Sequence, residues 1–244
     1  MGSIEDEFEA VLAGQDGPPE VELLPVRLAR ACAAVLPVAG AGISALAHPD
    51  LRLPIGSSDD VAAYAERLQF TYGEGPCLFA YTAGRPQLIT ESHLQQTWPE
   101  LHREIRSVTP FRSVVALPLY EPSIRTRIGA LDLYLATPST LEPDQLADAL
   151  LVADRIGQIL SGTGMYNSAA QQQIAFRVHQ EHTDPLARRI LVWKAMGLLN
   201  VHLLVTAPDA LALLRARAYA TDQLVDDVAH DIVTHRIALE DLRP

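Results

Sequence analysis

Stretches with strand-like and helix-like hydrophobic patterns alternate along residues 21–162. Five short runs, separated by turn-forming residues, are apolar or alternate polar with apolar positions and therefore predict β-strands: residues 40–46, 51–55, 88–90, 113–120 and 127–136. Helices are predicted where apolar side chains recur every three or four residues or where capping residues occur, at residues 21–36, 57–69, 100–106 and 144–160. This order predicts an α+β domain, in which helices pack against a sheet.

The pattern changes after Gly162, because no strand-like run follows it. Residues 168–181 have a helical pattern, and three further helices are expected to begin at caps provided by Asp184, Thr206 and Thr221. On the first of these helices the side chains expected to share one face are Leu186, Ile190, Trp193 and Gly197. Three helices in this space predict a small bundle, which is marginal alone and is expected to have a partner surface.

The chain therefore divides into four segments. Residues 1–20 carry several acids and no base, and a Gly-Pro-Pro stretch interrupts them, so we expect a flexible acidic tail with at most a short helix. The others are an α+β domain at residues 21–162, a helical linker at residues 163–183 and an all-α bundle at residues 184–244.

Composition narrows the class of protein. The chain has 244 residues, of which 48% are hydrophobic and 20% charged, which is enough apolar material for a sizeable core. The formal net charge of −11 argues against attachment to nucleic acid or anionic membrane by bulk charge alone. No apolar run reaches the roughly 18 residues that span a bilayer, and the acidic start resembles no signal peptide. We therefore expect a cytoplasmic protein with no membrane partner.

Motifs for catalysis and metal binding are missing from the sequence. It contains no phosphate-binding GxxxxGK[ST], no GxSxG and no HExxH pattern, and no paired carboxylates stand out. Cys32 and Cys77 are 45 positions apart, form no metal-binding spacing and are typical of reduced thiols. We expect neither an enzyme nor a metal site.

Residues 70–160 resemble a GAF domain of the kind found in actinobacterial regulators. The similarity lies in the order and spacing of FTYGEGPC, AYTAGRP, WP, RSVVALPL and IGALDLY, at residues 70–77, 80–86, 98–99, 112–119 and 128–134. The resemblance implies an antiparallel sheet packed by helices, and a pocket for a small-molecule or redox signal. Candidate pocket residues are Cys77, Phe79, Tyr81, His93, Trp98, Asp132 and Tyr134.

The chemistry of that pocket stays open at the level of sequence. Cys77 follows Gly75 and Pro76 and is either a thiolate favoured by a helix N-terminus or a small buried thiol. Asp132 interrupts an apolar strand and either orients a ligand or is a hydrogen-bonded structural acid. His93 is weak support for haem, no bilin-attachment or cyclic-nucleotide pattern is present, and the cofactor stays unknown.

Residues 186–239 resemble an ANTAR domain, the three-helix RNA-binding module of transcription antiterminators. The similarity lies in VWKAMGLL at residues 192–199, DALALLRARAY at residues 209–219, and apolar positions at Val205, Leu224, 228–229 and 232–233. Together the two resemblances indicate a GAF–ANTAR regulator, in which a sensor domain drives an RNA-binding domain.

Cations and one aromatic side chain of the bundle are the candidate RNA contacts. We expect the arginine and lysine side chains to contact RNA phosphates and Tyr219 to stack on an unpaired nucleobase. The full candidate set is Arg188, Arg189, Lys194, Ala195, Gly197, Arg215, Arg217 and Tyr219. The alternative is that the arginines are solvated surface residues and that Tyr219 fills the core. Ala195 and Gly197 permit either close helix packing or close approach of RNA. Asp226, Asp227 and Asp231 should point away from RNA.

The resulting hypothesis is a signal-responsive antiterminator that binds RNA hairpins in nascent transcripts as a homodimer. A dimer is expected because two linked bundles bind RNA more tightly than one. The candidate dimer helices are residues 144–160 and 168–182. A second hypothesis is a ligand-binding or dimerisation module whose bundle does not bind RNA. A third is a thiol-based reductase with a GAF fold that uses Cys77 and Cys32, which the sequence favours least.

Overall fold

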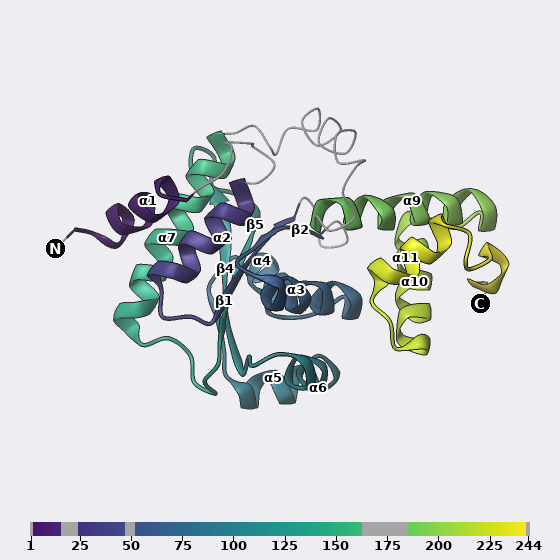
Figure 1. Cartoon of the computed structure of the whole chain (residues 1–244), viewed down its shortest axis with the longest axis horizontal. Helices are drawn as coiled ribbons and strands as arrows, with labels where there is room; N and C mark the ends of the chain where they lie inside the picture. Colours follow the sequence, from purple (N-terminus) through teal and green to yellow (C-terminus); the bar gives the residue numbers. More distant parts are fainter. Residues whose placement is uncertain (1, 16–23, 47–51, 163–184, 243–244) are drawn as a thin grey trace.

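The computed structural model describes residues 2–15, 24–46, 52–162 and 185–242. Its centre is a five-stranded antiparallel sheet in the order β2-β1-β5-β4-β3 (Figure 1). The strands are β1 (Gly40–Leu46), β2 (Arg52–Ser57), β3 (Gln87–Ile89), β4 (Ser113–Glu121) and β5 (Thr126–Leu135). All five predicted strands are confirmed to within two residues at each end.

One face of the sheet is covered by α1 (Ile4–Ala13), α2 (Leu24–Val35) and α7 (Pro143–Gly162) (Figure 1). The expectation of a flexible tail is wrong for residues 4–13. Ser3 and Asp6 form a reciprocal capping box at the start of α1, and Phe8 is fully buried in the core beneath the sheet. A capped first turn and one buried aromatic ring explain the ordered helix, because burying such a side chain contributes about 1.5–3 kcal/mol.

The opposite face carries α3 (Asp60–Tyr72), α4 (Pro76–Ala83), α5 (Glu91–Thr97) and α6 (Pro99–Val108). A separate hydrophobic cluster from α3, α5 and α6 packs there against Phe111 and Tyr134. The start of α3 differs from prediction: Asp59, and not a serine, caps it by accepting a hydrogen bond from the Ala62 amide at 2.8 Å. The two short helices α4 and α5 were not predicted from the sequence.

The C-terminal part is a helical bundle of α9 (Pro185–Leu203), α10 (Ala207–Thr221) and α11 (Val225–Val233), followed by a short turn of 3₁₀ helix, η3 (Leu239–Leu242). Thr206 caps α10 in a capping box with Asp209, as predicted. Thr221 instead ends α10, and α11 starts after Leu224. The cap expected at Asp184 and the helix expected at residues 168–181 lie outside the described residues.

The buried face of α9 matches the predicted one only in part. Ile190 is buried and Trp193 half-buried, as expected, while the side chain of Leu186 lies outside the described part of the chain. Val192, Ala195, Met196 and Leu199 enter the bundle core, whereas Gly197 is exposed, with no neighbouring atom within 4 Å of an added Cβ. The side chains at positions 192, 195, 196 and 199 follow the three- and four-residue spacing of a single helix face. The prediction therefore chose a face that lies beside the observed one on the helix.

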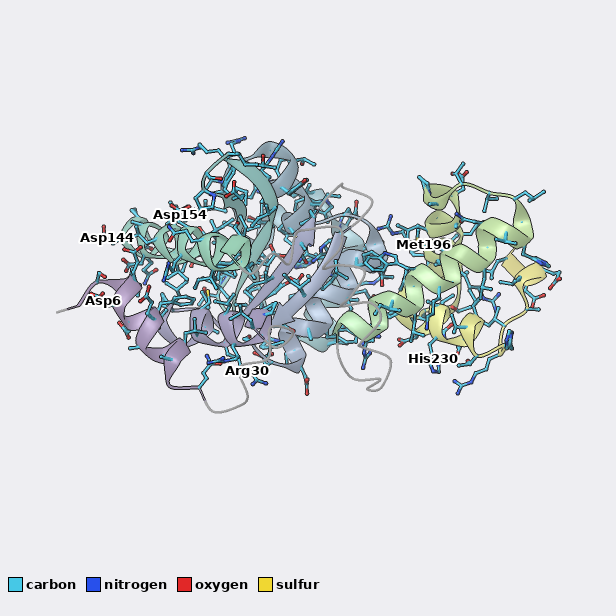
Figure 2. All side chains as sticks on the ribbon, turned by 90° about the horizontal axis from the view of Figure 1, so that it is seen from above. Asp6, Arg30, Asp144, Asp154, Met196 and His230 are labelled. Atoms are coloured by element: carbon cyan, nitrogen blue, oxygen red, sulfur yellow. The ribbon has the colours of Figure 1, made fainter. Side chains whose placement is uncertain are left out.

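The bundle contacts the α+β domain at two places. α9 runs against the edge strand β2, and α10 and α11 contact α3; Figure 1 shows α3 between the sheet and the bundle. Trp193 of α9 packs against the hydrophobic clusters of both domains. In the view from above, Met196 and His230 mark the bundle at one end and Asp144 and Asp154 of α7 lie at the other (Figure 2).

Within the described ranges, no single helix is both long and apolar enough to cross a membrane; α9 and α10 meet the length and composition limits only as a pair, bent by 109°.

Candidate functional site

A cluster of buried polar side chains lies between the sheet and helix α3. We call it the polar cluster, and its members are Ser44, Arg52, Glu66, Gln69, Asp132 and Tyr134. Three strands and one helix contribute to it: β1, β2, β5 and α3. Buried polar groups are rarely left without hydrogen-bond partners, and these residues find most of their partners in one another.

The ion pair between Arg52 and Glu66 is the centre of the polar cluster. Arg52 Nη2 contacts Glu66 Oε2, and both side chains are almost fully buried. Arg52 also donates through Nε to Ser44 Oγ at 3.1 Å, and Ser44 Oγ donates to Glu66 Oε2 at 2.8 Å. Burial opposes the charge on Arg52, but the surrounding Cys77, Glu66 and Asp132 groups more than offset this and raise its pKa.

Gln69 and Tyr134 connect this ion pair to the carboxyl group of Asp132. Tyr134 Oη donates to Glu66 Oε1 at 2.7 Å. Gln69 Nε2 donates to Asp132 Oδ2 at 2.6 Å and to Tyr134 Oη at 2.9 Å. The side-chain oxygen of Gln69 accepts the Cys77 amide at 3.1 Å, so the same residue also fixes the start of α4.

The surroundings of Asp132 favour its protonated form. Burial and the nearby charge of Glu66 raise the pKa of the Asp132 carboxyl well above its ordinary value. Its Oδ1 atom has no hydrogen-bond partner among the residues that the structure describes. Burial and the Glu66 charge likewise raise the pKa of Tyr134. These shifts favour an arrangement in which the buried Arg52–Glu66 ion pair has uncharged neighbours.

Two glycines make room for the polar cluster. A Cβ at Gly42 would lie 2.3 Å from Glu66 Oε1, and a Cβ at Gly75 would lie 2.6 Å from Gln69 Oε1. Gly75 also has a φ of +132°, which other residues rarely adopt. These positions explain a GxG run on β1 and the GEGP turn before α4 without any phosphate-binding role.

Cys77 is a buried thiol and not an activated one. It is the second residue of α4, close to a helix N-terminus as predicted. Burial raises the pKa of Cys77 well above its usual range, and Asp132 and Glu66 add to this, although Arg52 opposes it. Because the nucleophile in thiol chemistry is the thiolate, this environment disfavours a reactive Cys77. Cys32 is also buried, which raises its pKa to about 12.

Six of the seven predicted pocket residues fall into two groups. Cys77, Asp132 and Tyr134 are at the polar cluster. Phe79 and His93 instead pack on Trp98, with ring centroids 6.1 Å and 6.4 Å away, and both are exposed, so they are at the surface.

Tyr81 belongs to neither group. Its ring lies under the Arg127 guanidinium, at 5.4 Å from the centroid, and packs beside a small cluster that contains Cys77.

Sequence reasoning missed four of the six members of the polar cluster: Ser44, Arg52, Glu66 and Gln69. A helical-face argument would have found two of them. Glu66 and Gln69 fall on the same side of α3 as the buried Ala62 and Ala65. An acid and an amide on an apolar helix face require buried partners, and that is a recognisable signal.

The predicted RNA contacts also separate by exposure. Lys194, Gly197 and Tyr219 are exposed on α9 and α10. Ala195 is fully buried in the bundle core, where its small size permits close helix packing, one of the two roles considered for it. Tyr219 does not fill the core, since its residue is 67% exposed.

The predicted arginine contacts are less accessible than expected. Arg188 and Arg217 are half-buried, and the side chain of Arg189 lies outside the described part of the chain. Arg215 is bound by the α+β domain: its Nε donates to the Phe70 carbonyl oxygen at 3.2 Å, and its guanidinium lies 5.3 Å from the centre of the Phe70 ring.

Helix α3 holds the bundle through the face next to the one that builds the polar cluster. Arg67 contacts Asp226 at 3.2 Å and Asp227 at 2.9 Å, both on α11. Thr71 Oγ1 accepts the Val225 amide at 3.1 Å. Asp226 and Asp227 therefore face the α+β domain, while Asp231 contacts Arg236 at 3.2 Å.

The described residues include no group of three or more His, Cys, Asp or Glu side chains that could hold a metal ion.

Comparison with known proteins gives similarity in fold only. No protein-family model and no curated protein matches the sequence. Similar solved structures include the GAF domain of an Acinetobacter phosphoenolpyruvate-protein phosphotransferase, at 12% identity and TM-score 0.49, covering 67% of this chain and 96% of that one. Another is the phycocyanobilin-bound GAF domain of a cyanobacterial phytochrome, at 13% identity and TM-score 0.45, covering 69% of this chain and 99% of that one. A third is fRMsr of Staphylococcus aureus, at 11% identity and TM-score 0.43, covering 64% of this chain and 95% of that one. At these values the similarities establish no family, ligand or activity for this chain.

Proposed function

We propose that the α+β domain is a GAF-type sensor for a small molecule and that the helical bundle is its ANTAR-type, RNA-binding output. One observation carries this proposal: α3 contributes Glu66 and Gln69 to the polar cluster and Arg67 and Phe70 to the bundle contact. A ligand that rearranges the polar cluster acts on the helix that holds the bundle. The resemblance of residues 70–160 and 186–239 to GAF and ANTAR domains supplies the two roles.

The docked arrangement is the state with weaker RNA binding. Arg215, a candidate phosphate contact, is engaged by Phe70 in this arrangement. Separation from α3 would return Arg215 to the same surface as Tyr219 one turn later on α10. RNA affinity then depends on the fraction of molecules in which the bundle is released, and the sensor ligand alters that fraction.

A small molecule is a better signal than redox change. Cys77 is buried, and its environment raises its pKa, so an oxidant meets neither an accessible nor an ionised thiol. The same observation speaks against the reductase hypothesis. The proposed regulator has no catalytic step and works in the cytosol, where it would meet nascent transcripts.

The decisive experiment compares RNA binding by the full-length protein and its Arg67→Ala variant. The probe is a two-hairpin RNA with unpaired loops, measured against a scrambled duplex over a salt series. Losing the contacts to Asp226 and Asp227 should release the bundle and raise affinity for the loops about 5- to 30-fold, which corresponds to about 1–2 kcal/mol of coupling. Affinity should fall as salt rises.

Two further variants make the result specific. Arg30→Ala removes the same charge from an exposed site on α2, away from the bundle (Figure 2), and should leave binding unchanged. Adding Lys194→Ala to Arg67→Ala should abolish the gain. If neither the wild type nor Arg67→Ala binds loops selectively at low salt, the RNA-binding proposal is wrong.

A second function has its own support. Of the predicted RNA contacts, Ala195 is buried and Arg215 is engaged by the sensor, as expected of a bundle that serves as a docking or dimerisation element. Leu150 and Leu151 on α7 are partly exposed and support a homodimer through that helix. Light scattering tests this, and a strict monomer with and without RNA would contradict the dimer.

A further inference from the structure

A cavity of about 550 Å³ lies where the sensor meets the bundle, away from the polar cluster. Its walls come from α3, α6 and α10 and from the segment that starts α11. This volume is within the range of small-molecule sites, which often lie between domains. The nature of its walls indicates the kind of molecule it takes.

The cavity has aromatic walls and an apolar floor. Tyr64 and Tyr72 of α3 and Tyr219 of α10 contribute rings, and Leu68 and Leu224 contribute apolar surface. Guanidinium groups already lie over aromatic rings around this junction: Arg67 over Tyr64 at 5.9 Å, in addition to Arg215 over Phe70. Aromatic faces attract cations through their ring quadrupoles, so these walls suit a cationic group.

Carboxylates outnumber cations around the cavity. Glu104, Asp222 and Asp227 line it, and Glu100 and Asp226 are partners of arginines there. The three arginines nearby are all engaged: Arg103 by Glu100 and Glu104, Arg67 by Asp226 and Asp227, and Arg215 by the Phe70 carbonyl. Five carboxylates and three guanidinium groups leave a net charge of −2.

Two further observations indicate negative potential inside the cavity. The carboxylate of Asp222 has no hydrogen-bond or ion-pair partner among the residues described by the structure, although it lines the cavity. Burial and the charge of Glu104 raise the pKa of Tyr72, even though Arg103 opposes this. An anionic group such as an RNA phosphate is therefore disfavoured here, and a cation is favoured.

We propose that the cavity between α3, α6 and α10 is a binding site for a small organic cation, an amine or amidine on a flat apolar body. Its charged end lies by Asp222 and its body lies among Tyr64, Tyr72 and Tyr219. Since walls from both domains contact it, the cation stabilises the docked arrangement, because a ligand favours the state that binds it.

The test uses isothermal titration calorimetry on the full-length protein with benzamidine, and benzamide as a neutral molecule of nearly the same shape. We expect one benzamidine per chain with a Kd on the order of 1 mM, as befits a fragment of this size. Benzamide should bind at least about tenfold more weakly, because it lacks the charge that the carboxylates attract.

Two variants locate the binding site. Tyr219→Ala removes one aromatic wall from a residue that is mostly exposed, and Asp222→Asn removes the charge while keeping a residue that tolerates the left-handed backbone found there, at φ +53°. Each should weaken benzamidine binding at least about fivefold. Asp154→Asn changes an exposed acid on α7, far from the bundle (Figure 2), and should have no effect.

Three results would overturn the proposal. Equal binding of benzamide and benzamidine would show that charge plays no part. Unchanged binding in both cavity variants, with circular dichroism matching the wild type, would place the site elsewhere. A titration without saturable heat would show that the cavity takes no such cation.

Discussion

Two arginine–carboxylate contacts beside α3 have opposite surroundings. The pair of Arg52 and Glu66 is inside the α+β domain, with 5% and 2% of the side chains exposed. The contact of Arg67 with Asp227 is at the junction with the bundle, where 18% of the Arg67 side chain and 51% of that of Asp227 are exposed. The first pair is dry and bonded on every side, and the second is open to water on one side.

The difference predicts how each contact behaves. Breaking a buried pair by removing one partner leaves an uncompensated charge and costs about 3–5 kcal/mol. Exposed pairs are worth about 0.2–1 kcal/mol, because water solvates the separated charges. The Arg67–Asp227 contact should therefore break far more often than the buried pair, as the proposed reversible release of the bundle requires.

The largest expected effect comes from removing both carboxyl charges near Arg52. In Glu66→Gln/Asp132→Asn the Arg52 guanidinium is buried with no carboxylate beside it, and we expect a loss of about 3–5 kcal/mol in the free energy of unfolding. Urea unfolding followed by circular dichroism measures it. Glu66→Gln alone should cost less, because Asp132 can then lose its proton and balance the charge.

Adding Arg52→Met to the double variant supplies the control. With the charge gone, most of the lost stability should return, since apolar replacements of buried ion pairs are often neutral. If the triple variant is no more stable than the double, lost packing rather than the uncompensated charge is the cause.

Asp132→Asn tests the protonated carboxyl. The pKa of Asp132 is higher in the folded protein than in the unfolded chain, so the folded state holds the proton more tightly. Wild-type stability should then fall as pH rises above about 4, by up to about 1.4 kcal/mol per pH unit from this group. Asparagine mimics the protonated acid and does not titrate. The free energy of unfolding of the variant should therefore rise relative to that of the wild type between about pH 4 and 7, as measured by urea unfolding. Parallel pH profiles would contradict the protonated state.

The smallest expected effect distinguishes the two acids at the junction. Asp227→Asn removes the exposed partner of Arg67 and should cost less than about 1 kcal/mol. Asp226→Asn removes a carboxylate that is 2% exposed and should cost more, because buried charged hydrogen bonds are worth about 1.5–3 kcal/mol. Thermal unfolding of the two variants side by side measures the difference, and equal losses would mean that burial does not set the strength of this contact.

Much of the architecture followed from the sequence, because the strands have strong and regular apolar patterns. Boundaries set by a single capping residue were less predictable. Asp59 competes with two serines for the start of α3, and Leu224 begins α11 without any side-chain cap. Residues 4–13 were misjudged because their acidic composition hid one aromatic side chain, Phe8, that reaches the core.

The candidate site was less predictable than the fold. The resemblance singled out Cys77, Asp132 and Tyr134, and the structure brings them to one place. It gave no sign of Arg52 and Glu66, because their partnership joins a strand to a helix and is a matter of tertiary packing. The engagement of Arg215 by Phe70 joins residues 145 positions apart, which no local pattern records.

Helix α3 also constrains how its own sequence can change. Successive residues on a helix are 100° apart, so Glu66 and Arg67, or Gln69 and Phe70, point to different domains only while the register is kept. A single inserted or deleted residue near position 65 would turn Gln69 toward the bundle or Phe70 toward the sheet. Point substitutions along α3 can be absorbed one domain at a time, but a change in its length alters both domains at once, so this helix should keep its thirteen residues while the loops around it vary.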